Sequence, residues 1–92
     1  MAWNRLSNYK TVVLSLDDMM TVTYHSTNIV RWDDNKIILQ SGGHTTATTK
    51  KKMNQTSYQF DLGYHVFQKD WKWFVDYNGE TLEFNDDMEL AR

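Results

Sequence analysis

The stretch from 41 to 52 combines the residue types that bind anions. A Ser-Gly-Gly turn is followed by threonine hydroxyls and three consecutive lysines, and no acidic residue occurs between Asn35 and Phe60. Glycines let the backbone approach a ligand closely, free amides and hydroxyls donate hydrogen bonds, and ammonium groups add charge. The residues of this candidate anion-binding site are Ser41, Gly42, Gly43, Thr48, Thr49, Lys50, Lys51 and Lys52. The Walker pattern is absent, so nucleotide hydrolysis is not implied.

The same three lysines have a second interpretation. The N-terminus of a helix carries about half a positive charge, so a lysine in the first turn costs roughly 0.3–1 kcal/mol. In this interpretation Lys50, Lys51 and Lys52 lie in the middle of a helix and form a solvated face. Both interpretations are compatible with the sequence.

The C-terminal third combines aromatic side chains with the opposite charge. From Asp76 to Arg92, six carboxylates face one arginine, which gives −5, whereas the stretch from Asn35 to Phe60 carries four lysines and no acid, which gives +4. Such a surface can occupy a basic groove on another protein, and Trp and Tyr are enriched at protein interfaces. The candidate interface consists of Trp71, Trp73, Tyr77, Glu80, Glu83, Asp86, Asp87 and Glu89.

Three alternatives to this interface remain. Trp71, Trp73 and Tyr77 alternate with period two, so they project from one side of a strand and can be core residues. The carboxylates can mark a solvated edge strand that is protected from pairing. The aromatic rings could instead stack on nucleic-acid bases, but only Lys69 and Lys72 accompany them.

Catalysis and metal binding are not expected. The three histidines, His25, His44 and His65, are not spaced as metal ligands, and the chain has no cysteine. Ser41, His44 and Asp61 supply the residue types of a hydrolase triad, but no nucleophile-elbow motif surrounds the serine. We therefore expect neither an enzyme nor a metal or cofactor site.

Length and composition bound the class of protein. Ninety-two residues suffice for one domain, 1–92, with a single core, and the hydrophobic content of 40% is enough to fill it. Without cysteines, an export signal or an apolar stretch of roughly 18 residues, the chain is expected to be cytoplasmic and not associated with a membrane.

The elements that must position these residues are strands around one helix. Period-two runs predict strands before residue 41 and after residue 63, with hairpins over about 28–40 and 71–84, the second marked by Asn78-Gly79. A helix is predicted over about 46–61, with Thr48 or Thr49 as N-cap and Gly63 as the left-handed residue at its end. The expected class is α+β: an antiparallel sheet of about five to seven strands with one helix packed on one face.

Several blocks resemble a group of short proteins encoded in tailed-bacteriophage genomes. They are 24–30, Ser41-Gly42-Gly43 with 45–50, Met53-Asn54-Gln55, and 63–69 with Trp73-Phe74-Val75, within roughly residues 20–85. His44 and Lys52 depart from the group, which has an aromatic residue and an arginine at these two positions. The group has no established activity to transfer.

The resemblance implies a phage protein that is expressed in a bacterial host. Small phage accessory proteins are typically binders that inhibit or redirect a host protein, so we expect a host protein as partner and an anti-CRISPR or similar host-takeover function. The alternative is a module that binds a small anion, a nucleotide or a nucleic acid through Ser41–Lys52.

Overall fold

The computed structural model describes residues 11–16, 18–43 and 45–92, and within these ranges the chain forms eight strands and one helix. The elements before the helix are β1 (Thr11–Leu16), β2 (Met19–Tyr24), β3 (Thr27–Trp32) and β4 (Lys36–Leu39). Helix α1 (Ala47–Phe60) is followed by β5 (Tyr64–Lys69), β6 (Lys72–Tyr77), β7 (Glu80–Glu83) and β8 (Met88–Ala91). The predicted α+β class is confirmed.

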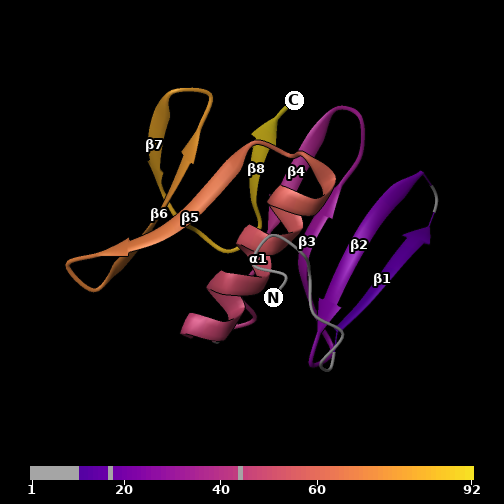
Figure 1. The fold of residues 1–92 in the computed structure, drawn as a ribbon, viewed down its shortest axis with the longest axis horizontal. Helices are drawn as coiled ribbons and strands as arrows, with labels where there is room; N and C mark the ends of the chain where they lie inside the picture. Colours follow the sequence, from indigo (N-terminus) through magenta and orange to yellow (C-terminus); the bar gives the residue numbers. More distant parts are fainter. Residues whose placement is uncertain (1–10, 17, 44) are drawn as a thin grey trace.

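The described strands form two sheets where the sequence predicts one. Sheet A has the order β1-β2-β3-β4-β8 and sheet B the order β5-β6-β7, and every pairing is antiparallel. Figure 1 shows α1 in front, between sheet B on the left and sheet A on the right. No described strand of sheet B pairs with one of sheet A, and β8, which follows β7 in the sequence, does not extend sheet B. It returns to β4, where Leu90 pairs with Ile37 and is 2% exposed.

One core joins both sheets and the helix. Cross-strand pairing places Val22, Val30 and Leu39 in a row on the inner face of sheet A, and all three are fully buried. The rings of Trp32 on β3 and Phe60 on α1 lie 4.9 Å apart. Sheet B adds inward-facing residues such as Val66 and Val75, so the core is continuous from sheet A through α1 to sheet B.

The helix caps lie two or three residues away from the predicted ones. Thr46 is the N-cap, because its hydroxyl accepts from the Thr49 amide, whereas Thr48 and Thr49 lie inside the first turn. At the other end the left-handed cap is Asp61, with φ of 55°, and the predicted Gly63 also has a positive φ, of 82°, two residues further on. A short polar side chain tolerates this conformation, so glycine is not required at the cap itself.

Helix α1 is attached to β5 mainly through polar side chains. The Asn54 side chain donates to the Val66 carbonyl at 2.8 Å and accepts from the Val66 amide at 2.7 Å. Ser57 makes the same pair of bonds with the Tyr64 backbone, at 2.7 and 3.1 Å. Asn54 and Ser57 therefore bond the outer edge of β5 as a neighbouring strand would, which explains why these two polar residues lie on the side of α1 that faces β5.

Two-residue turns connect β2 to β3, β5 to β6 and β6 to β7. Both residues of each turn have positive φ, as type I′ turns require. Asn78-Gly79 is the preferred pair for this geometry, but Asp70-Trp71 is not, because a bulky side chain is disfavoured at positive φ. Asp33 makes a different turn before β4, where its carboxylate accepts from the Asn35 and Lys36 amides.

Candidate binding surfaces

The Ser-Gly-Gly loop does not present free donors to an anion. The amide and hydroxyl of Ser41 both donate to one carboxylate oxygen of Asp86, at 2.9 and 2.7 Å. The Gly42 amide donates to the Gln40 side chain, and the Gly43 amide donates to the Ser41 hydroxyl. The predicted donors of Ser41, Gly42 and Gly43 are therefore used within the chain, and the anion that Ser41 binds is the carboxylate of Asp86.

Gly42 is needed for packing as well as for the turn. Its φ is 67°, and a Cβ atom added to it would lie 2.6 Å from the Thr27 hydroxyl oxygen. That distance is too short for a non-bonded contact between a carbon and an oxygen atom, so a side chain at this position would force the Thr27 side chain, at the start of β3, to move. The glycine that suggested close approach to a ligand thus accommodates a neighbouring strand.

The predicted site residues on the helix point in different directions. Thr48 is exposed and Thr49 is buried, where its hydroxyl lies 3.0 Å from that of Thr46. The three lysines lie in the second turn, not the first, and they do not form one solvated face. Lys51 is exposed and Lys50 is half-buried, whereas Lys52 is 3% exposed.

Lys52 is directed at sheet A. Its ammonium group lies 5.0 Å from the centre of the Tyr24 ring, a cation–π distance. Burial lowers the pKa of Lys52 below its ordinary value, and the charge of Lys51 lowers it further. Lys52 therefore belongs to the contact between α1 and the end of β2, whereas Lys50 and Lys51 face β5.

Lys50 and Lys51 line a groove of about 680 Å³ between α1 and β5. The other lining residues are Ala47, Asn54, Gln55, Tyr58 and His65. Tyr58 is 74% exposed, which is unusual for an aromatic side chain on a helix. A smaller cavity of about 430 Å³ lies on the sheet A side of the helix and includes Ser41, Thr46 and Thr49 in its lining. The predicted anion site is thus divided between two hollows.

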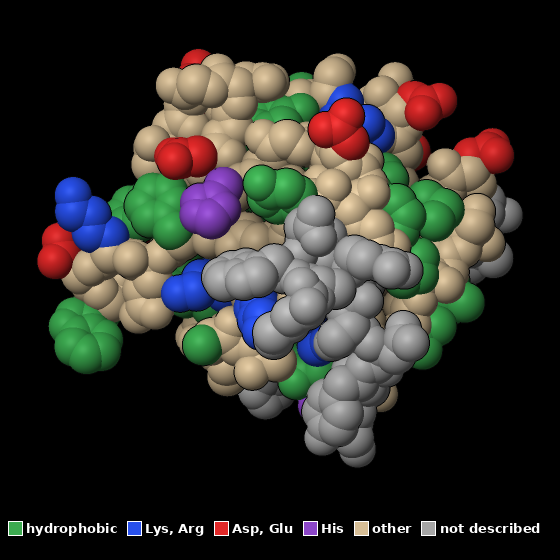
Figure 2. Space-filling view, in the orientation of Figure 1, with side chains coloured by type: hydrophobic (Ala, Val, Ile, Leu, Met, Phe, Trp, Pro, Cys, Tyr) green, Lys and Arg blue, Asp and Glu red, His purple; other side chains and the backbone are tan. Residues whose placement is uncertain are grey.

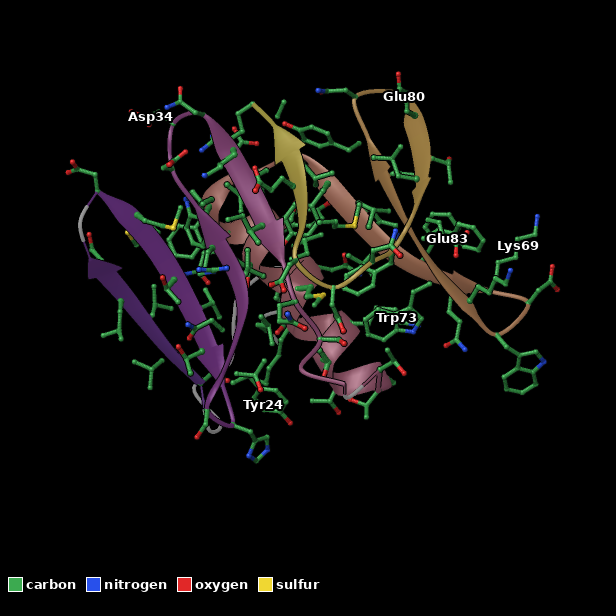
Figure 3. All side chains as sticks on the ribbon, turned by 180° about the vertical axis from the view of Figure 1, so that it is seen from behind. Tyr24, Asp34, Lys69, Trp73, Glu80 and Glu83 are labelled. Atoms are coloured by element: carbon green, nitrogen blue, oxygen red, sulfur yellow. The ribbon has the colours of Figure 1, made fainter. Side chains whose placement is uncertain are left out.

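The aromatic stripe of β6 is largely a core stripe, which was one of the alternatives. Trp73 is 7% exposed and its ring meets that of Phe84 edge-on at 5.3 Å. The Tyr77 hydroxyl donates to the Ala91 carbonyl and so links sheet B to β8. Figure 3 shows Trp73 on the inner side of sheet B. These two members of the candidate interface are therefore structural.

Trp71 differs from the other members of the stripe. It lies outside β6, in the turn after β5, with φ of 69° and 92% of its surface exposed. A tryptophan at this place buries almost nothing and occupies a conformation that suits glycine. No contribution to the fold explains it.

The outer face of sheet B carries a row of side chains that the sequence alone does not predict as a surface. Strand register places eight side chains on this face: His65, Phe67, Lys69, Lys72, Phe74, Asp76, Thr81 and Glu83. The rings of His65 and Phe67 stack at 6.2 Å, and those of Phe67 and Phe74 at 5.7 Å. Figure 2 shows green side chains on both sides of a purple histidine over sheet B, with blue side chains below them. The period-two alternation of β5 and β6 predicts that these side chains share one face. It does not predict which face is exposed, because both faces carry aromatic residues.

The acidic members of the candidate interface are dispersed. Glu80 and Glu83 are exposed on β7, whereas Glu89 is exposed on β8 in the other sheet. Asp86 holds Ser41, and Asp87 accepts from the Gln40 side chain at 2.8 Å. Figure 3 shows Glu80 and Lys69 at opposite ends of sheet B. The charge separation thus persists along sheet B, but two of the carboxylates hold the 40–43 loop.

The two lysines of the groove and the carboxylates of the C-terminal segment lie apart. Within the part of the chain that the structure describes, neither Lys50 nor Lys51 is paired with Asp86, Asp87 or Glu89. The same residues contain no cluster of three or more His, Asp or Glu side chains that could hold a metal ion. None of the described helical residues forms a stretch long and apolar enough to cross a bilayer.

Comparison with known proteins gives one family match. The model of the family described as Kyanoviridae Gp96 protein matches residues 1–91. Neither the curated proteins nor the solved structures contain a significant match to this chain.

Proposed function

The chain belongs to the Kyanoviridae Gp96 family of phage proteins, and from this premise we propose that it is a small binding protein that engages a host protein. Binding inhibits or redirects the target in the host cytoplasm, as an anti-CRISPR protein or another host-takeover inhibitor does. The proposal requires no cofactor and no catalysis. The surface that carries it is the outer face of sheet B together with Trp71.

The single observation that supports this surface is the position of Trp71. A large aromatic residue held in the left-handed region costs about 1–2 kcal/mol relative to glycine, and strain of this kind clusters at functional sites. In the other turn of sheet B the equivalent position is Gly79, a residue that adopts this conformation without strain. Tryptophan is among the residues most enriched at the energetic centre of protein interfaces.

The side chains around Trp71 indicate which charged and apolar groups a complementary partner surface carries. Lys69 and Lys72 flank the Trp71 turn, and the half-buried rings of Phe67 and Phe74 continue from it across the outer face. Glu80 lies at the far end of sheet B. A complementary partner has an apolar pocket for the indole, acidic groups around this pocket and basic groups further away.

Replacing Trp71 by glycine tests the proposal. Trp71→Gly creates Asp-Gly, a favoured type I′ pair, and is expected to raise the stability by about 1 kcal/mol. It should nevertheless reduce binding to the host protein at least tenfold, since truncation of an interface hot spot costs about 2 kcal/mol or more. The measurements are quantitative co-purification from host lysate, followed by titration with the purified partner.

Tyr58→Ala is the matched control, because it removes another highly exposed aromatic side chain from a different surface. We expect this variant to retain the partner, and we expect recovery by the wild-type chain to fall as salt is raised. Equal recovery by wild type and Trp71→Gly, or the absence of any partner dependent on Trp71, would contradict the proposed surface.

A second candidate function is binding of a small anion, a nucleotide or a nucleic acid. The observation that favours it is the groove in which Lys50 and Lys51 lie beside His65 and Tyr58. Lysines beside exposed aromatic rings suit a phosphate backbone with stacked bases. Fluorescence anisotropy with a single-stranded oligonucleotide tests it. Binding should weaken with salt and be lost in the Lys50→Glu, Lys51→Glu double variant.

A further inference from the structure

Arg31 lies at the centre of the outer face of sheet A, the face opposite to α1 and the core. It belongs to β3, the middle strand of the five, and its neighbours Val30 and Trp32 are buried in the core. Successive side chains of a strand point to opposite faces, so Arg31 projects outward. Its Nε atom is nevertheless buried and has no hydrogen-bond partner. Within the part of the chain that the structure describes, its guanidinium forms no hydrogen bond or ion pair.

Two carboxylates of sheet A could have served Arg31, but neither does. Asp33, two residues further along the chain, accepts from the Asn35 and Lys36 amides. Glu89 lies on β8, beyond the whole width of β4, and two strand spacings amount to about 9–10 Å. A buried charged donor without an acceptor lowers the stability of the isolated chain, so Arg31 calls for an explanation outside the fold.

The side chains around Arg31 on this face are mainly apolar or carry hydroxyl groups. Strand register places Thr21 and then Leu14 on one side of Arg31, and Ile38 on the other. Leu14 is 53% exposed, and Val12, two residues earlier on the same face, is 51% exposed. Figure 3 shows sheet A from behind, with α1 on the far side of its strands. A partly buried charge in such surroundings attracts an opposite charge more strongly than a charge in water does.

We propose that the outer face of sheet A binds a protein segment that presents an Asp or Glu carboxylate between apolar side chains. The carboxylate accepts hydrogen bonds from the guanidinium of Arg31, whose planar fork matches it, and the apolar side chains cover Leu14 and Val12. A nucleic acid would need a series of cations along its backbone, whereas Arg31 stands among apolar and hydroxyl-bearing neighbours. The inference does not rest on the function proposed above, which concerns sheet B.

Selection of the full chain against a displayed library of random peptides tests this site with a defined probe. The wild type should enrich peptides with Asp or Glu between apolar residues, and an enriched peptide should bind at least tenfold more weakly to Arg31→Met. Arg31→Lys should restore only part of this affinity, because it keeps the charge and loses the fork. Trp71→Gly should bind the peptide as the wild type does, so this inference and the proposed function can fail separately. An absence of enrichment, enrichment without an acidic residue, or equal binding by Arg31→Met would overturn the inference.

Urea denaturation without peptide separates a binding role of Arg31 from a structural one. Arg31→Met keeps an unbranched apolar stem and removes the unsatisfied nitrogen, so its denaturation midpoint should equal or exceed that of the wild type. Lys72→Met is the matched control, because it removes an exposed cation from a strand of the other sheet, and it should leave the midpoint unchanged. A midpoint of Arg31→Met well below that of Lys72→Met would show that Arg31 supports the fold and would overturn the inference.

Discussion

The outer edges of β5 and β1 differ in which described groups bond to their backbone. Each strand ends its sheet and presents backbone donors and acceptors on one side. At β5, Asn54 and Ser57 reach from α1 and bond the backbone of Val66 and Tyr64. At β1, no described element performs this role, and Val12 and Leu14 are exposed.

The difference shows which interactions attach α1 to sheet B and which side chains of β1 remain exposed. Helix α1 has a weakly apolar inner surface, on which Thr49, Thr56 and Ser57 are buried alongside Met53. Its attachment to sheet B therefore includes specific hydrogen bonds as well as the apolar contacts of the core. Val12 and Leu14 on β1 are 51% and 53% exposed, so changes at these two positions should affect stability less than changes at the β5 edge.

The largest effect is expected where the β5 edge loses its partner. Ser57→Ala leaves both the amide and the carbonyl of Tyr64 without their present partner in a buried place. Each unsatisfied buried group costs about 1–3 kcal/mol, so the expected loss of stability is about 2–4 kcal/mol by urea denaturation. Tyr58→Ala, at the next position on the exposed side, should change stability by less than about 0.5 kcal/mol. Similar losses for both variants would mean that the hydrogen bonds are not decisive.

A smaller effect is expected from Tyr64→Phe on the same strand. The Tyr64 hydroxyl donates to the Met53 carbonyl at 2.6 Å, and its removal should cost about 0.5–1.5 kcal/mol at neutral pH. Burial raises the pKa of Tyr64 well above its ordinary value. The folded protein thus keeps this proton longer than the unfolded chain, so stability falls as pH rises above about 10. Denaturation at pH 8 and 11 should show that this alkaline loss is reduced in Tyr64→Phe.

Lys52, which joins α1 to sheet A, should give an effect of the opposite sign with pH. Its pKa is lowered by burial, so the unfolded chain binds this proton more readily than the folded protein does. Stability relative to Lys52→Met is therefore expected to increase as pH rises from the lowered pKa towards the ordinary lysine value of about 10.4. Parallel urea titrations of the two proteins at pH 7 and 10 measure it. A constant difference between the proteins would argue against the burial effect.

The smallest effect on folding is expected at the β1 edge. Leu14→Lys replaces a side chain that is 53% exposed, and we expect a change in stability of less than about 0.5 kcal/mol. Urea denaturation of the wild type and the variant under the same conditions measures it. A loss as large as that of Ser57→Ala would show that β1 supports the fold as strongly as β5 does.

Local signals in the sequence were sufficient for several elements. Asn78-Gly79 indicates the turn between β6 and β7, and a helix predicted over 46–61 corresponds to α1 at Ala47–Phe60. The cap was misplaced because threonine occupies positions 45, 46, 48 and 49, and each can serve as an N-cap. Which threonine does so depends on where the preceding loop is held.

Contacts between distant parts of the chain could not be predicted in this way. The bonds from Ser41 to Asp86 span 45 residues, and they turn a candidate anion donor and a candidate interface acid into partners of each other. The inner face of sheet B could not be predicted either, because it also depends on contacts between distant parts of the chain. Trp73 and Phe74 are both aromatic, so period two identifies two faces without saying which one α1 covers.

The return of β8 to β4 has a consequence for the order of folding. Ile37 and Leu90 are paired across more than half of the chain, whereas the hairpins of both sheets connect strands that are close in sequence. Closing long loops is entropically costly and slow, so the hairpins should form before β8 docks. During that interval β4 is an open edge that carries Ile37, Ile38 and Leu39, and a newly made chain is then most prone to aggregate.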